Sequence, residues 1–92
     1  MTVTVRIPAQ LRSLTGGSAE VGADGATVGE VIAALDKEHP GVQERLLDEE
    51  GRLRRFVNLF LADEDVRFLE GLDTPVRDGQ TLSVVPAVAG GC

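Results

Sequence analysis

The chain has 92 residues, which is enough for one domain with a single hydrophobic core. Its formal net charge of -6 argues against nucleic acid and anionic membranes as partners, because both attract basic surfaces, and it permits a basic protein partner. One cysteine excludes an internal disulfide, and the core must be mainly aliphatic because the only aromatic residues are three phenylalanines.

The N-terminal segment has the pattern of a strand. In residues 2–7, valine or isoleucine alternates with threonine or arginine, which predicts a half-buried strand that ends near Pro8. Gly16 and Gly17 predict a turn, and residues 18–21 predict a short returning strand. The N-terminus lacks the basic segment followed by an apolar segment that is typical of a secretory signal. No apolar run approaches the ~20 residues of a membrane-spanning helix. We therefore expect a cytoplasmic protein.

A capped amphipathic helix follows. Thr27 and Glu30 fit a capping box, in which the Thr27 hydroxyl accepts from the Glu30 N–H and the Glu30 carboxylate accepts from the Thr27 N–H. The helix should end at His39, because Pro40 disfavours helical geometry at the residue before it. We assign His39 to capping rather than to catalysis, and we expect Asp36 to face water. The apolar stripe consists of Val28, Val31, Ile32 and Leu35.

The segment after this helix is rich in charge. Residues 43–47 predict a short second helix, and residues 52–55 contain arginines that form a small basic patch. The acidic clusters at residues 48–50 and 63–65 are interpreted as solvated loop charge.

Residues 56–61 predict the most apolar strand of the chain. One face carries Val57, Leu59 and Leu61, which we assign to the core because branched aliphatic side chains pack well against a helix. The other face carries Phe56, Asn58 and Phe60. Phe56 and Phe60 are either covered by a loop or form a docking patch for a partner, since exposed apolar surface often marks an interaction site.

The remaining elements are short. Residues 66–68 predict an edge strand, and residues 73–75 predict a turn. Asp78 and Gly79 predict the turn that leads into the last strand, residues 80–85.

These elements predict an α+β fold, with a mixed sheet of four to five strands packed on one main helix. Residues 1–86 would form this domain, and residues 87–92 would form a flexible C-terminal tail. No phosphate-binding glycine loop, nucleophile–base set or zinc-ligand spacing is present in the sequence. We therefore expect no catalytic residues, no metal and no enzymatic activity.

The C-terminal segment carries the chemistry instead. Gly90 and Gly91 have no packing value, because glycine has no side chain, but they provide a slim backbone that can enter another protein's active site. Ala89 and Gly90 would be the threading residues of this candidate reactive end.

The chain resembles the ubiquitin-like sulfur-carrier proteins of the ThiS/MoaD type, which have a β-grasp fold. It is most similar to the actinobacterial carriers of thiocarboxylate-dependent cysteine biosynthesis. The matching segments are residues 3–5, 7–8, 11–12, 15–17, 45–46, 55–58, 63–68 and 85–91. The most specific of them are Asp-Glu-Asp-Val-Arg-Phe at residues 63–68 and Pro-Ala-Val-Ala-Gly-Gly at residues 86–91.

The resemblance implies a cycle of partner enzymes. An E1-like adenylyltransferase would adenylate the Gly91 carboxylate with ATP, and sulfur would displace AMP to leave a thiocarboxylate. A PLP-dependent cysteine synthase, or another sulfur-accepting enzyme that makes a sulfur-containing metabolite, would take the sulfur. A JAMM-type zinc metalloprotease would release the cysteine. ATP, PLP and zinc belong to these enzymes, so the carrier is expected to bind no cofactor and to be monomeric when free.

Cys92 departs from the family pattern, in which active carriers end at the second glycine. With Gly91 in a peptide bond to Cys92, no Gly91 carboxylate exists to be adenylated. Cys92 is either encoded and removed by a peptidase, or the cysteine product joined to the carrier, or an added thiol without a role. Two other functions remain open: a ubiquitin-like modifier conjugated to lysines through Gly91, and a β-grasp interaction module with an inert tail.

Overall fold

The computed structural model describes residues 2–54 and 57–86 of the chain. The strands are β1 (Thr2–Arg6), β2 (Glu20–Asp24), β3 (Val57–Leu61), β4 (Glu64–Asp65) and β5 (Thr81–Pro86). They form a five-stranded mixed sheet in the order β2-β1-β5-β3-β4. The strand β5 pairs in parallel with β1 and antiparallel with β3, while β1–β2 and β3–β4 are antiparallel pairs. The α+β prediction is confirmed, and the last strand lies at the centre of the sheet.

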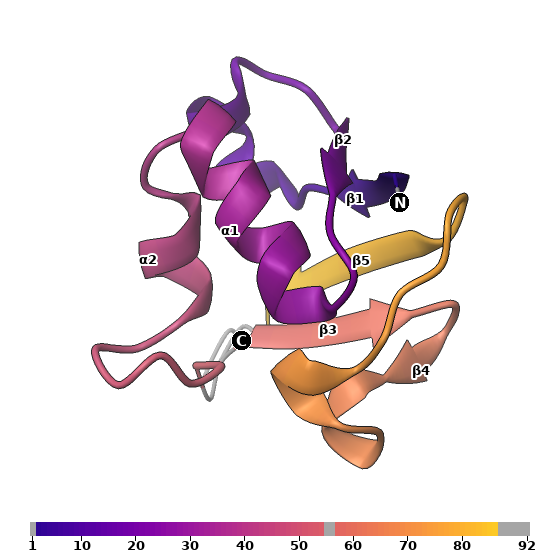
Figure 1. The fold of residues 1–92 in the computed structure, drawn as a ribbon. Coiled ribbons are helices and arrows are strands. Elements are labelled where there is room, and N and C mark those ends of the chain that lie inside the picture. The colour runs from indigo at the N-terminus through magenta and orange to yellow at the C-terminus, as the bar shows by residue number, and fades with distance from the viewer. Residues whose placement is uncertain (1, 55–56, 87–92) are drawn as a thin grey trace.

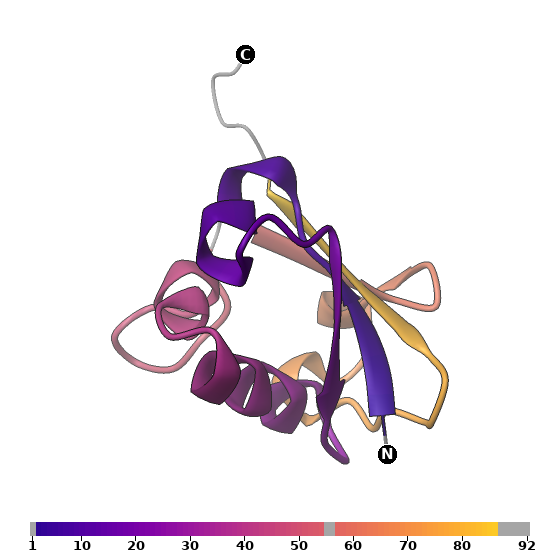
Figure 2. The same ribbon diagram turned by 90° about the horizontal axis from the view of Figure 1, so that it is seen from above.

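One face of the sheet is covered by helices. The helix α1 (Val28–Glu38) crosses this face, and the short helix α2 (Val42–Leu46) lies beside it (Figures 1 and 2). Alternate strand residues and the apolar stripe of α1 meet in a single core, as the sequence patterns predict. Its fully buried side chains include Val3, Val5, Val28, Val31, Ile32, Leu35, Leu46, Leu59 and Leu82.

The start of α1 is held by side chains of its own first turn. The Thr27 hydroxyl accepts from the Glu30 N–H at 3.2 Å, as the capping box predicts. The Glu30 carboxylate accepts from the N–H of Ala26 at 3.0 Å, one residue before the predicted donor. His39 is the residue that caps the other end, and its N–H donates to the Leu35 carbonyl at 2.8 Å.

The prediction that Asp36 faces water is wrong, because this residue is half-buried. Its Oδ1 accepts from the backbone N–H groups of Gly41 and Gln43, each at 3.1 Å. These are donors at the start of α2, whose own N-cap residue Gly41 has no side chain to offer. A side chain of α1 therefore caps the next helix.

Two predicted strands differ from the structure. A 3-10 helix, η1 (Ala9–Thr15), lies in the connection, and the returning strand occupies residues 20–24 rather than 18–21. Ser18 belongs to the turn, because its N–H donates to the Thr15 carbonyl at 3.3 Å and its carbonyl accepts from the Thr15 hydroxyl at 2.9 Å. Residues 66–68 form a 3-10 helix, η2 (Val66–Phe68), and the edge strand is β4 instead. The Asp65 carboxylate accepts from the Arg67 N–H at 2.9 Å, and Val66 is buried in the core. This segment therefore turns toward the core instead of extending along the sheet.

The other short elements follow the predictions more closely. The second helix begins one residue earlier than predicted, and the predicted turn at residues 73–75 overlaps a 3-10 helix, η3 (Gly71–Asp73). No helix in the described residues is both long and apolar enough to cross a membrane. The division between a domain and a C-terminal tail after residue 86 stays a prediction, since residues 87–92 lie outside the described part of the chain.

Candidate functional site

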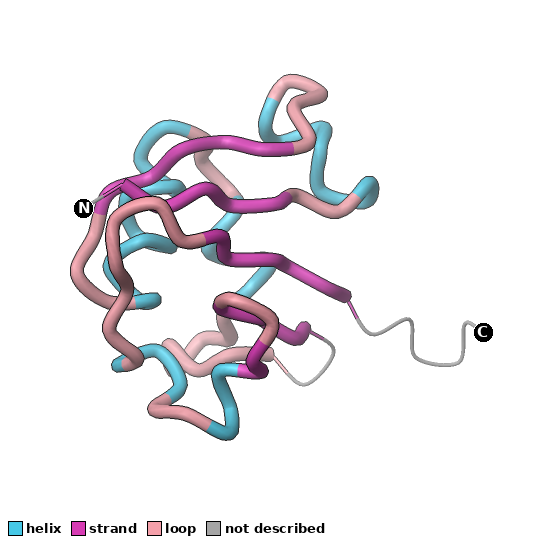
Figure 3. Tube along the Cα trace, turned by 90° about the vertical axis from the view of Figure 1, so that its right-hand side faces the viewer, coloured by secondary structure: helices cyan, strands magenta, loops and turns pink. Residues whose placement is uncertain are grey.

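The central strand β5 leads directly to the predicted reactive segment. It is paired on both sides, with β1 along Thr81–Ser83 and with β3 as far as Pro86, which faces Val57. The chain therefore leaves the sheet from a fixed point between β1 and β3, and Figure 3 shows this end of β5. The predicted site residues Ala89, Gly90, Gly91 and Cys92 follow within a few residues and lie outside the described residues.

The face of the sheet opposite α1 presents an apolar spot close to the end of β5. In β3, Val57, Leu59 and Leu61 are buried, as predicted, while Phe60 on the other face is half-buried. Phe60 lies opposite Ser83, and Asn58 lies opposite Val85, whose side chain is 41% exposed. We call Phe60 and Val85 the open-face patch. The other predicted docking residue, Phe56, lies outside the described residues.

An arginine network connects this face to the helical layer. Arg67 donates from Nη1 to Asn58 Oδ1 at 2.6 Å and from Nη2 to the Arg54 carbonyl at 2.7 Å. Arg54 in turn donates from Nε to the Glu44 carbonyl in α2 at 2.9 Å. The sequence indicated a basic patch at residues 52–55 but did not connect Arg67 to it. No local sequence pattern could reveal this connection, because the Arg67 contacts depend on how η2 folds back against β3.

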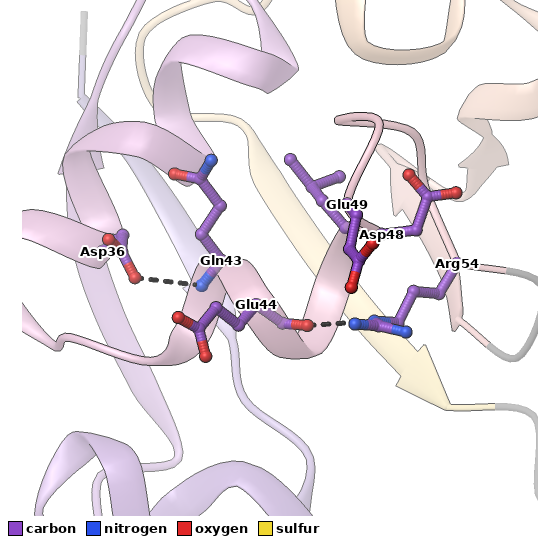
Figure 4. Close-up of a pocket in the computed structure, with 7 residues that line it drawn as sticks. Asp36, Gln43, Glu44, Asp48, Glu49 and Arg54 are labelled. Carbon is purple, nitrogen blue, oxygen red and sulfur yellow. Dashed lines mark hydrogen bonds between the residues drawn. The ribbon is translucent and has the colours of Figure 1, made fainter.

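A surface pocket of about 490 Å³ lies on the helical side, between α1, α2 and the loop after α2 (Figure 4). Its lining is mainly acidic and comprises Asp36, Gln43, Glu44, Leu47, Asp48, Glu49 and Arg54. Asp36 and Asp48 are engaged with backbone N–H groups, Asp48 with those of Glu50 and Arg52 at 2.9 and 3.0 Å. The bond from Arg52 is the main reason that the pKa of Asp48 lies below its usual value. These carboxylates shape the loop.

The acidic clusters only partly match the prediction of solvated loop charge. Glu49, Glu50, Asp63 and Glu64 are exposed, as predicted, whereas Asp48 is half-buried and organises the loop that follows it. Within the described residues, no group of His, Cys, Asp and Glu side chains is arranged to hold a metal ion.

A mixed five-stranded sheet that wraps one main helix and has its last strand in the centre defines a ubiquitin-like β-grasp protein. The sequence matches the ThiS family over residues 5–91, and the chain belongs to that family. Both the predicted fold and the predicted family are thereby confirmed.

The relatives are sulfur carriers and small modifiers. The chain is 50% identical to the sulfur carrier protein CysO of Mycobacterium tuberculosis over 93 aligned residues, which cover 99% of this chain and 100% of that protein. A chain in the crystal structure of the Amycolatopsis orientalis BexX/CysO complex has a TM-score of 0.91 and 53% identity, covering 97% of this chain and 99% of that one. The crystal structure of the small archaeal modifier protein SAMP1 of Haloferax volcanii has a TM-score of 0.82 and 28% identity, covering 99% of this chain and 100% of that one. The likeness to CysO supports a sulfur-carrier role.

Proposed function

We propose that this protein carries sulfur as a thiocarboxylate on Gly91. The observation that supports the proposal most directly is the Gly90-Gly91 pair, placed a few residues beyond the central strand of a ThiS-family chain that is half identical to CysO. The protein would be a co-substrate of enzymes rather than an enzyme itself, and it would act in the cytoplasm, where the ATP for activation is available.

The proposed activation takes two steps. A carboxylate is a poor acyl donor, so an E1-like adenylyltransferase first joins the Gly91 carboxylate to AMP from ATP, releasing pyrophosphate. A sulfide equivalent then attacks the acyl carbon, the bond to the AMP oxygen breaks, and a thiocarboxylate remains. Gly90 and Gly91 suit this chemistry because no Cβ obstructs a narrow active site. Fully extended, residues 87–91 span about 17 Å, enough to reach a buried site while the domain docks outside.

Cys92 must be absent from the active form. While Gly91 is bonded to Cys92, no Gly91 carboxylate is available for adenylation. A JAMM-type zinc metalloprotease would cut the Gly91–Cys92 bond, whether Cys92 is encoded or is the product of a previous cycle. In the second case a PLP-dependent cysteine synthase would hold an aminoacrylate that receives the sulfur. An S-to-N acyl shift would then place cysteine on Gly91 through an amide.

The sulfur acceptor determines the product of the cycle. Relatives named CysO favour cysteine as the product. The A. orientalis CysO is seen in a complex with BexX, which supports a carrier that engages protein partners. A sulfur-containing metabolite is the alternative product.

The test is intact-mass analysis after incubation with an E1-like adenylyltransferase, ATP and sulfide. Two forms are compared, the full chain and a chain that ends at Gly91. We expect exchange of one oxygen for sulfur in the shortened form alone. A thiocarboxylate on the full chain would contradict the blocking role of Cys92. No exchange on either form would contradict the carrier function and favour an interaction module with an inert tail.

A protein modifier is the second candidate function. It is favoured by the likeness to the small archaeal modifier protein SAMP1, and it would use the same activation of Gly91. Expression of the shortened form in the native host distinguishes the two functions. Adducts between Gly91 and lysine side chains of cellular proteins would favour the modifier, while recovery of only free carrier and its thiocarboxylate would favour the sulfur carrier.

A further inference from the structure

Arginine side chains stand on both sides of the point where the chain leaves β5. On one side, β1 runs parallel to β5, so both strands end at the same end of the sheet. The 3-10 helix η1, which contains Arg12, follows β1 there, and Figures 2 and 3 show it beside the end of β5. On the other side, β3 begins at Val57 opposite Pro86, and the Arg54–Arg67 network lies at this beginning of β3. We call Arg12, Arg54 and Arg67 the arginine collar.

The collar is held in place by neutral acceptors. Arg12 donates from Nε to the Ile7 carbonyl at 3.1 Å, while Arg54 and Arg67 donate to carbonyl and amide oxygens. In the described part of the chain, the one ion pair within 4 Å is Arg6–Glu20, at 3.2 Å. The three arginines are exposed residues, and each side chain keeps N–H donors that no hydrogen bond within the described residues uses. The charge of Arg54 is partly compensated by Asp48, because the Arg54 guanidinium helps to lower the pKa of the Asp48 carboxyl group.

The opposite end of the sheet is acidic. The start of β1, the β3–β4 turn and the turn before β5 meet there, and the Asp78 carboxylate accepts from the Thr2 N–H at 2.9 Å. The carboxylates at this end include Asp24, Asp63, Glu64 and Asp78, with Arg77 as a cation among them. The collar end also has carboxylates: Glu20 lines a surface hollow with Arg12, and Glu44, Asp48 and Glu49 line the pocket with Arg54. In the described residues, however, no collar guanidinium lies within 4 Å of a carboxylate.

We propose that the arginine collar binds carboxylates on the rim of the partner's active-site opening, so that the partner enzyme presents an acidic surface around the site that receives Gly91. The proposal rests on the proposed function. The net charge alone permits a basic partner, whereas the arginine collar requires an acidic partner surface at this docking site. Arginine suits the task because its planar guanidinium can bond a carboxylate through two N–H groups.

The nucleotide is a less suitable occupant of the collar. Adenylation places the Gly91 carboxyl group at the α-phosphate of ATP, and extended residues 87–91 put that group about 17 Å beyond the end of β5. The collar then lies at the mouth of the site, against protein, rather than beside the phosphates. Charges at the rim of an interface act mainly on the association rate and on its salt dependence.

The experiment measures steady-state adenylation of the chain that ends at Gly91 by an E1-like adenylyltransferase, across a range of salt concentrations. The variants are Arg12→Gln and Arg67→Gln, with Arg12→Lys as the charge-preserving variant and Arg77→Gln as the matched control at the opposite end. At low salt we expect KM for the carrier to rise about 3- to 10-fold in each glutamine variant, with kcat unchanged. The difference should vanish near 1 M salt, where the screening length falls to about 3 Å. Arg12→Lys should retain most of the salt dependence, and thermal unfolding verifies that each variant is folded.

The outcomes separate failure of the collar proposal from failure of the carrier function. If the parent chain is adenylated and the collar variants match Arg77→Gln, the collar proposal is wrong and the carrier function stands. An equal rise in KM for Arg77→Gln would show an effect of net charge alone, and it would also contradict the proposal that the collar binds the partner. If the parent chain is neither bound nor adenylated, the proposed function fails, and the collar proposal fails with it.

Discussion

The turn between β3 and β4 places two residues other than glycine in the left-handed region. Ala62 has φ 51° and Asp63 has φ 73°, which suits a tight hairpin because positive φ at both turn residues matches the twist of the strands. A Cβ in this region is strained by about 1–2 kcal/mol. We therefore expect Ala62→Gly to stabilise the fold by about 0.5–1 kcal/mol, after allowing for the greater freedom of glycine in the unfolded chain. Urea unfolding measures the change.

Gly79 offers the matched control for this prediction. It has φ 85°, and a Cβ added there would meet nothing within 4 Å, so in the folded state a substitution changes only the backbone strain. Gly79→Ala should destabilise the fold by about 1 kcal/mol. A loss of stability in Ala62→Gly would contradict the assignment of strain to the β3–β4 turn.

At the scale of elements, α2 depends on a side chain from α1. This helix has only five residues, so it is too short to be stable alone. Its N-cap residue is a glycine, so its first N–H groups need an acceptor from outside. Asp36 provides that acceptor for Gly41 and Gln43. We expect Asp36→Ala to lower the free energy of unfolding by about 1–2 kcal/mol, the range for loss of a helix cap. Urea unfolding is again the measurement.

The neighbouring Lys37→Ala variant controls for the change to alanine in the same turn of α1. Lys37 is exposed and has no hydrogen bond from its side chain in the described residues, so its replacement should leave stability nearly unchanged. If both variants unfold at the same urea concentration, Asp36 does not cap α2.

At the scale of the whole molecule, the sheet separates a covered face from an open one. α1 and α2 bury one face, and the open-face patch of Phe60 and Val85 lies on the other, close to the end of β5. A partner that receives Gly91 must approach this end. We expect Phe60→Ala to raise KM for the carrier in adenylation by about 10-fold, as for a central aromatic contact in an interface. The steady-state assay on the chain that ends at Gly91 measures it.

Phe68→Ala is the control for removing a phenyl ring from the surface. Phe68 is 87% exposed on η2, which follows β4 in the chain, and is not part of the open-face patch. Its replacement should leave KM unchanged. Equal KM values for Phe60→Ala and the parent chain, with the fold retained, would remove the docking role of Phe60.

Only part of the candidate site was predictable. The burial of Val57, Leu59 and Leu61 and the outward position of Phe60 follow from the two-residue period of a strand. The edge strand predicted for residues 66–68 is a 3-10 helix in the structure. The Asp65 side chain bonds the Arg67 backbone instead, and this local hydrogen bond competes with pairing along the sheet.

The sequence by itself determined the identity of the elements and the chemistry of the C-terminal segment. The apolar periods identified which side of each strand and helix faces the core, the capping box placed the start of α1, and Gly90-Gly91 indicated a reactive end. Only the tertiary structure decided that β5 lies between β1 and β3, that Asp36 caps α2, and that arginines flank the end of β5. The physical reason is that periodicity and capping act within one or two turns of chain, whereas strand order and contacts such as Arg67–Asn58 depend on how distant segments pack.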